Sequence, residues 1–210
     1  MDAVVTITVP GRGAVESAAD IAGATFVVEA TRPTAAEARA TAAAAAAEVL
    51  DALGGTGVAR ADLRTSGLDV QAAWDHETGR PIRRGFTVTH RIAATIRDLE
   101  AVGRVVDAGL GAGATGLDGV EFRIADADGP TREARALAVR DARDRADTIA
   151  AAAGRTLGSL RSIVEGGDPG GPGPRREMRM MAMAAGDVET PVLPGRIEVS
   201  VRVVAEWTLD

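Results

Sequence analysis

The sequence has no cysteine and no lysine, and aromatic residues make up only 2% of it. Without cysteine, disulfides, thiolate catalysis and cysteine-based zinc or iron–sulfur sites are excluded. Without lysine, Schiff-base and P-loop lysine chemistry are excluded as well. The scarcity of aromatics argues against a base-stacking platform, and it favours a core of Ala, Val, Leu and Ile with helices packed closely on a sheet.

The formal net charge of −6 and the pI of about 5.1 indicate an acidic protein. Proteins that bind phosphate backbones or anionic lipid carry positive charge instead. We therefore expect no nucleic acid partner. The 210 residues are 46% hydrophobic, which is enough to bury the core of one large domain or of two small intertwined ones. No stretch approaches the length of a membrane span. The first ten residues have neither a basic n-region nor an apolar h-region, so a cytoplasmic chain is expected, with export as the alternative if a leader was removed.

Alternating apolar residues predict two strands near the N-terminus. Val5, Ile7 and Val9 share one face of the first, which we expect to end in a turn over residues 10–13, Pro-Gly-Arg-Gly. The second strand covers residues 22–30 and ends before Pro33. Their succession predicts a hairpin.

A long alanine-rich helix is predicted next. Thr34 and Glu37 have the spacing of a capping box, and the helix runs to Leu53, where two glycines stop it. So many alanines allow a close approach to a neighbouring element, so intimate packing is expected.

The middle of the chain predicts further strands around a short helix. Residues 62–74 form a less regular strand, residues 75–81 a polar turn, and residues 86–97 a long strand with the cleanest alternation in the chain. Asp98 can cap a short helix over residues 99–110. A strand with Val120, Phe122 and Ile124 inward follows.

A second long helix is predicted from Asp128, its expected cap, to Gly154. Its apolar stripe consists of Ala134, Leu137, Ala138, Ala142, Ala146, Ile149 and Ala153. Strands are expected at residues 160–165 and from Ile197 to Trp207. The order of elements predicts an α+β fold of antiparallel sheets packed by two long helices and one short helix, in two interlocked halves.

A Gly/Pro/Met-rich insertion at residues 166–195 interrupts this pattern. Its Gly/Pro run at 166–174 is incompatible with regular structure, so we expect a flexible segment. A Met/Arg tract follows: Arg175, Arg176, Met178, Arg179, Met180, Met181 and Met183. This tract is the candidate interaction site, because methionines make adaptable apolar contacts and arginines suit an acidic partner surface. A plain disordered loop is one alternative. Cu(I) binding or redox chemistry at Met178, Met180, Met181 and Met183 is the other.

Three motifs resemble known ligand or metal sites, but the sequence around each one argues against such a site. Residues 111–116 match G-x-G-x-x-G, but they follow a predicted helix and open a strand, the reverse of a dinucleotide site. Asp126 and Asp128 suggest a calcium loop, but Leu137 stands where its last glutamate is required. His76 and His90 lack ligand spacing, and His90 is better explained as a core or interface histidine. The sequence therefore predicts no cofactor and no enzyme.

Several runs in order along the chain resemble the SIMPL-domain family, which includes bacterial periplasmic immunogenic and oxidative-stress-defence proteins. The runs are Val9–Gly13, Asp62–Ser66 with Leu68, Gly85-Phe86, Arg97-Asp98-Leu99 with Gly103, Gly119–Phe122, residues 133–158 from Glu133-Ala134-Arg135 to Leu157-Gly158, and Pro191–Gly195. They span nearly the whole chain, so one SIMPL-like domain over residues 1–210 is expected.

The resemblance implies an α+β monomer that assembles into rings or channel-like oligomers, with roles in stress defence and, in eukaryotic relatives, in association with signalling kinases. It implies no agreed catalytic residues. The chain departs from the family at Ala19-Asp20, where relatives tend to have Pro-Asp, and in lacking an export signal. We therefore expect a non-enzymatic, self-associating protein, a homo-oligomer linked to stress defence or to envelope or signalling assembly. Its expected contact is formed either by edge strands or by residues 175–193. A ligand- or metal-binding stress protein that uses the Met-rich insertion is the alternative.

Overall fold

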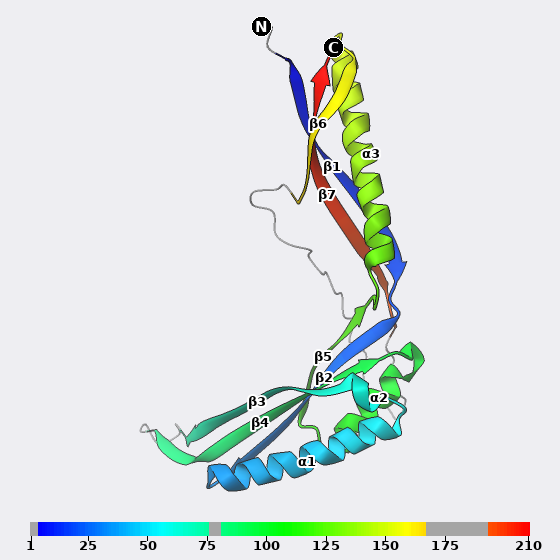
Figure 1. The fold of residues 1–210 in the computed structure, drawn as a ribbon. Coiled ribbons are helices and arrows are strands. Elements are labelled where there is room, and N and C mark those ends of the chain that lie inside the picture. Colours follow the sequence, from blue (N-terminus) through cyan, green and yellow to red (C-terminus); the bar gives the residue numbers. More distant parts are fainter. Residues whose placement is uncertain (1–3, 76–80, 167–192) are drawn as a thin grey trace. The chain divides into compact units, whose positions relative to one another are not determined.

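The chain folds into two compact units, each a helix-covered antiparallel sheet (Figure 1). The computed structural model describes residues 4–75, 81–166 and 193–210. The chain begins in a three-stranded unit, builds a four-stranded unit and then returns to the first. The predicted α+β class with two interlocked halves is confirmed.

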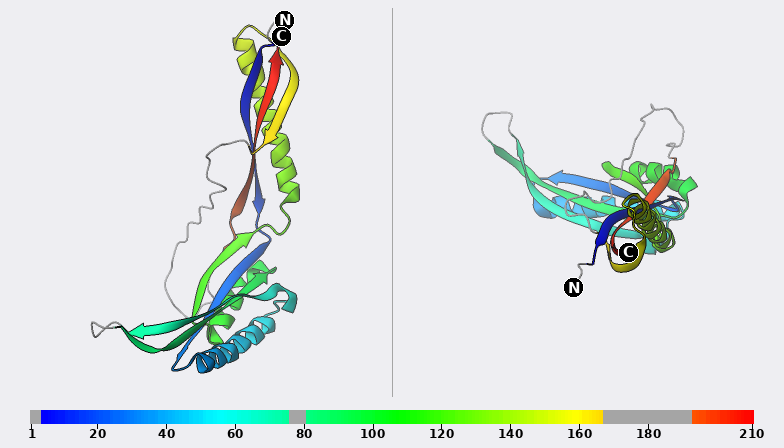
Figure 2. Two further views of the ribbon diagram at one scale, coloured as in Figure 1. Left: turned by 60° about the vertical axis from the view of Figure 1, so that its left-hand side comes forward. Right: turned by 90° about the horizontal axis from the view of Figure 1, so that it is seen from above.

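The three-stranded unit has strand order β1-β7-β6. It contains β1 (Thr6–Ala18), α3 (Asp128–Ala152), β6 (Leu157–Glu165) and β7 (Arg196–Leu209). β1 and β7 pair over their whole length without a register shift, from Thr6 opposite Thr208 to Ala18 opposite Arg196. α3 lies along β1 and β7 and barely reaches β6 (Figure 2). The core between helix and sheet contains Val9, Val201, Val203, Ala205, Trp207 and the alanines of α3.

α3 lies almost in backbone contact with β1, because both surfaces are made of small residues. A Cβ atom built on Gly11 would lie 2.1 Å from the carbonyl oxygen of Ala138, and one on Gly13 would lie 2.0 Å from that of Ala134. The turn predicted at residues 10–13 is therefore wrong, since the strand continues through it. Pro10 is tolerated because β1 is an edge strand, where one N–H need not pair.

The four-stranded unit has strand order β3-β4-β2-β5. It contains β2 (Ile21–Arg32), α1 (Ala35–Gly55), the 3-10 turn η1 (Arg60–Asp62), β3 (Leu63–Asp75), β4 (Ile82–Ile96), the 3-10 turn η2 (Leu99–Ala101), α2 (Val102–Gly111) and β5 (Gly116–Arg123). Phe26, Ile92, Leu53 and Val102 are fully buried at its centre. The hairpin predicted from the first two strands is wrong, because β1 pairs with β7 and β2 pairs with β4 and β5.

The helix boundaries follow local chemistry. The capping box of α1 is confirmed: the backbone N–H of Glu37 donates to the Thr34 hydroxyl, and the backbone N–H of Thr34 donates to the Glu37 carboxylate. Asp98 caps η2 as predicted. The prediction that Asp128 caps α3 is wrong, because Ala127 holds that position and Asp128 is the first helical residue.

The buried stripe of α3 is narrower than predicted. It consists of Ala134, Ala138, Ala142, Ala146 and Ala150, spaced four residues apart. Ile149 was predicted inside the stripe but is 49% exposed. A helix that rests on β1 and β7 alone needs only this narrow alanine face.

Candidate functional site

In the four-stranded unit, the strand β3 at the edge of the sheet is left uncovered by the helices. α1 packs on β2 and β4 and barely reaches β3. Val70 lies opposite the fully buried Val88, so its side chain points to the side of the sheet that α1 occupies. Yet Leu68 is 60% exposed and Val70 is 48% exposed. We call Leu68, Val70 and the exposed Trp74 the β3 edge surface.

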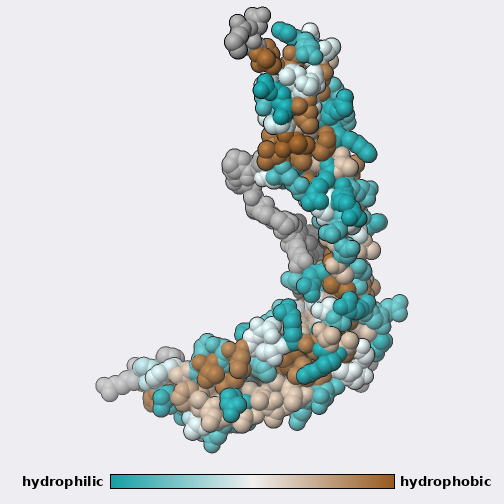
Figure 3. Space-filling view, in the orientation of Figure 1, coloured by the Kyte–Doolittle hydropathy of each residue, from teal (hydrophilic) through white to brown (hydrophobic). Residues whose placement is uncertain are grey.

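The three-stranded unit repeats this arrangement at β6. Leu160 lies opposite Trp207 and Ile163 opposite Ala205, both of which are buried beneath α3. Because α3 does not extend over β6, Leu160 and Ile163 stay about half exposed. We call Leu160, Ile163 and the exposed Val164 the β6 edge surface. In the space-filling view, hydrophobic surface lies over both edge strands (Figure 3).

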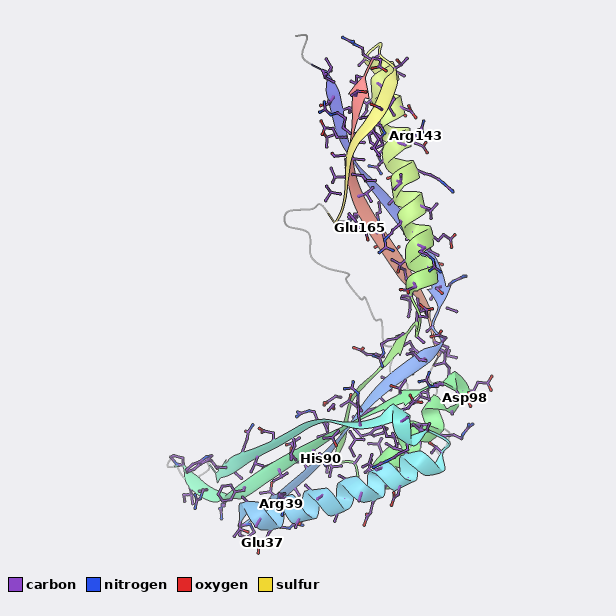
Figure 4. All side chains as sticks on the ribbon, viewed as in Figure 1. Glu37, Arg39, His90, Asp98, Arg143 and Glu165 are labelled. Carbon is purple, nitrogen blue, oxygen red and sulfur yellow. The ribbon has the colours of Figure 1, made fainter. Side chains whose placement is uncertain are left out.

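A salt bridge ties the C-terminal end of β6 to α3. The guanidinium Nε of Arg135 donates to the Glu165 carboxylate at 2.8 Å, and Glu165 lies near the end of the strand (Figure 4). This pair raises the pKa of Arg135. The bridge positions β6 beside the helix without covering Leu160 or Ile163, so the apolar edge remains accessible.

Two runs that carry the family resemblance meet in an ion pair. Arg97 donates from both Nε and Nη2 to the two carboxylate oxygens of Asp62, at 2.8 and 2.7 Å. These hydrogen bonds lower the pKa of Asp62, whose side chain is only 13% exposed. The pair borders a cavity of about 240 Å³ beside Thr95 and Val105. A bidentate pair satisfies both charged groups, so its evident role is to tie the start of β3 to the end of β4.

A second polar contact joins the glycine run of β1 to α3. The backbone N–H of Arg12 donates to Oδ2 of Asp141 at 2.8 Å. This hydrogen bond, helped by the guanidinium of Arg145, lowers the pKa of the Asp141 carboxyl. The residues that looked most family-like between 133 and 154 therefore hold α3 against β1.

The histidine prediction is confirmed only in part. His90 lies on the side of β4 turned toward α1 (Figure 4), opposite Leu68 of β3. Its Nε2 lies 3.4 Å from the Thr65 hydroxyl, but its Nδ1 is buried without a hydrogen-bond partner. His76 lies outside the described residues. Between residues 111 and 116, α2 ends and β5 begins, which confirms the order that argued against a dinucleotide site.

The Met/Arg tract cannot be placed in this site. Arg175, Arg176, Met178, Arg179, Met180, Met181 and Met183 all lie outside the described residues. Within the described ranges, no three His, Asp or Glu side chains gather as metal ligands would. Among the same residues, no helix is long and apolar enough to cross a membrane.

The sequence suggested edge strands as one possible contact but did not identify these residues. The available signal was the alternation of Leu68 and Val70 in a strand expected to be irregular. The sequence does not reveal the position of α1, and it is this position that leaves the two side chains exposed. The fold and its surfaces define a two-unit α+β protein in which each sheet leaves one apolar edge strand uncovered.

Comparisons with known proteins agree with this class. The model of the SIMPL family, described as a protein of unknown function (DUF541), matches residues 7–207. The chain is 32% identical to the 26 kDa periplasmic immunogenic protein of Brucella abortus (strain S19) over 212 residues, which covers 95% of this chain and 84% of that protein. It is 26% identical to the uncharacterized protein YggE of Escherichia coli (strain K12), over 75% of this chain and 64% of YggE. The chain therefore belongs to the SIMPL family.

Proposed function

We propose that this SIMPL protein is non-enzymatic and acts by self-association through its uncovered edge strands. The observation that carries the proposal is the pair of apolar edge surfaces, on β3 and β6, that the helices of their own units do not cover. An exposed edge strand with apolar side chains favours pairing with another chain.

The apolar side chains favour association, and the backbone hydrogen bonds of strand pairing must add to their contribution. Burying the remaining half of an exposed Leu or Val side chain contributes roughly 1 kcal/mol. Leu68, Val70, Leu160 and Ile163 together would contribute roughly 4 kcal/mol, before any backbone hydrogen bonds form and before the entropic cost of association. Such a contact fits an assembly that repeats the same interface in many copies.

The proposal also includes export of the protein from the cytoplasm. The Brucella relative is named a periplasmic protein, which supports the export alternative over a cytoplasmic site. Separating the periplasmic and cytoplasmic fractions of the native cell tests this. Recovery of the protein only with cytoplasmic markers would exclude export.

Sedimentation velocity of four proteins tests the contact surface. The first is the parent, and the second carries Leu68→Thr, Val70→Thr, Leu160→Thr and Ile163→Thr, which keep β-propensity but remove apolar surface. The third carries Leu110→Gln, which changes an exposed apolar residue on α2 instead. The fourth lacks residues 168–190, because residues 175–193 are the other contact that the sequence suggests.

We expect an oligomer from the parent, from Leu110→Gln and from the deletion, and a 21.4 kDa monomer from the quadruple variant. An unchanged oligomer in the quadruple variant would refute the edge-strand contact. A monomeric deletion variant would refute it too, because the contact would then belong to the deleted segment.

A further inference from the structure

β3 has a regular central segment that can accept another strand. The pairing of β3 with β4 shifts register between Thr65 and Gly67 and again between Ala73 and Trp74, but not between those points. Residues 67–73 therefore form seven consecutive residues of unbulged strand. Among the described strands, none pairs with the outer edge of β3.

The other sheet edges are less suited to strand addition. β1 contains Pro10, which has no N–H to offer a new strand, and beyond it the strand exposes the charged Arg12 and Glu16. β6 has two register shifts within nine residues, and such bulges disrupt the ladder that a new strand would extend. β5 has eight residues and a glycine, Gly119, with φ of 132°. β3 alone among these edges joins a regular backbone to exposed apolar side chains.

The segment 67–73 is complementary to itself. Two identical strands that pair antiparallel are related by a two-fold axis perpendicular to the sheet, and residues equidistant from that axis face one another. The midpoint of residues 67–73 is Val70. An axis there places Val70 opposite Val70 of the second copy, Leu68 opposite Ala72, Asp69 opposite Gln71, and Gly67 opposite Ala73.

Charge and backbone geometry select this register over its neighbours. Moving the axis by one residue to Asp69 would put two carboxylates directly opposite one another, which destabilises a strand pair. Moving it to Leu68 or Ala72 would carry the pairing across a register shift at one end of the segment. An axis at Val70 uses all seven regular residues and places no like charges opposite one another.

We propose that β3 pairs antiparallel with β3 of a second copy about a two-fold axis at Val70, joining two four-stranded sheets into one of eight strands. This rests on the proposed function and names its contact. Leu68 and Val70 lie on the side that α1 occupies in each copy, so the pairing forms one continuous apolar strip there. Asp69 and Gln71 lie on the opposite side and remain solvated.

Single cysteines test the axis directly, because the parent has none. Val70→Cys places two thiols opposite one another across the axis. Leu68→Cys is the matched control, since its two thiols would be separated by four residues of strand, about 14 Å. Leu68 is also the more exposed residue, so random collision would link it at least as readily as Val70. Each variant is treated with a thiol crosslinker too short to span 14 Å.

We expect a covalent dimer from Val70→Cys and little or none from Leu68→Cys. Equal linking of both variants would overturn the proposal, as would failure of Val70→Cys to link while sedimentation shows an oligomer. In that second case the protein still self-associates and only the assigned contact is wrong. A parent that sediments as a monomer would refute the proposed function itself.

A charge substitution gives a second readout. Val70→Asp places two carboxylates opposite one another and is expected to weaken dimerisation at least tenfold by sedimentation. Leu110→Asp introduces the same charge at an exposed residue of α2, outside both edge surfaces, and should leave this contact unchanged. Equal affinities of Val70→Asp and the parent would contradict the axis at Val70.

Discussion

The contact between β1 and α3 allows a sharp prediction for Gly11→Ala. The added Cβ would lie 2.1 Å from the carbonyl oxygen of Ala138 and 2.7 Å from the Cβ of Ala142. The first distance is 0.9 Å below the 3.0 Å that real Cβ contacts respect. Because the clashing oxygen belongs to the backbone, no side-chain rotation can relieve it, and α3 must move away from the sheet.

Gly11→Ala lowers the free energy of unfolding because it overpacks the contact between α3 and β1. Inserting a methyl group into a close-packed contact destabilises a protein by about 1–3 kcal/mol, and a rigid backbone neighbour places this case near the upper end. For a unit of this size, about 3 kcal/mol lowers the melting temperature by more than about 10 °C. Gly129→Ala, in the same unit, is the control, since its Cβ would meet no atom within 4 Å. It should be neutral or slightly stabilising.

Tryptophan fluorescence isolates the relevant unit. The chain has two tryptophans, the exposed Trp74 in the four-stranded unit and the buried Trp207 in the three-stranded unit. In a Trp74→Phe background, urea denaturation followed by Trp207 reports the unit that contains Gly11. If Gly11→Ala unfolds within about 0.5 kcal/mol of its parent, the scale of an ordinary surface substitution, the close approach of α3 to β1 is refuted.

Two further substitutions test the four-stranded unit. Thr34→Ala removes the hydroxyl that accepts from the Glu37 backbone N–H, although the backbone N–H of residue 34 can still donate to the Glu37 carboxylate. We expect it to destabilise the unit by about 1 kcal/mol in urea, whereas Thr34→Ser should retain most of the stability; equal stability of the Ala and parent proteins would contradict the role of the hydroxyl cap. Asp62→Asn tests the ion pair with Arg97. Pairing lowers the folded-state pKa of Asp62 below 3.8, so its stabilisation is complete above that pH and is lost as the pH falls through the folded value. The stability difference between parent and Asp62→Asn should therefore be largest near neutral pH and shrink as the pH falls below 3.8, and a difference independent of pH would exclude the pair as its cause.

The sequence predicted most elements because their signals are local. The capping box at Thr34 and the alternation from Phe86 to Ile96 each report a structure decided within a few residues. The first strand was mispredicted because Pro10, Gly11 and Gly13 serve a long-range contact. They look like a turn, yet they make room for a helix more than a hundred residues away. Strand partners were missed for the same reason, since β1 pairs with the last strand of the chain.

The candidate site was only partly accessible from sequence. Leu68 and Val70 alternate as strand residues should, and nothing local distinguishes them from the core residues Val88 and Ile92. Their exposure depends on where α1 rests, which is a property of packing rather than of pattern. The Met/Arg tract from Arg175 to Met183 remains a prediction from composition, because it lies outside the described residues.

The most direct test of the account is the solution mass of the unaltered chain as a function of concentration, measured by native mass spectrometry alongside sedimentation equilibrium. Self-association through uncovered edge strands predicts species at whole multiples of 21.4 kDa, with even-numbered assemblies prominent if the two-fold contact at Val70 holds. A single 21.4 kDa species throughout the micromolar range would contradict the central claim.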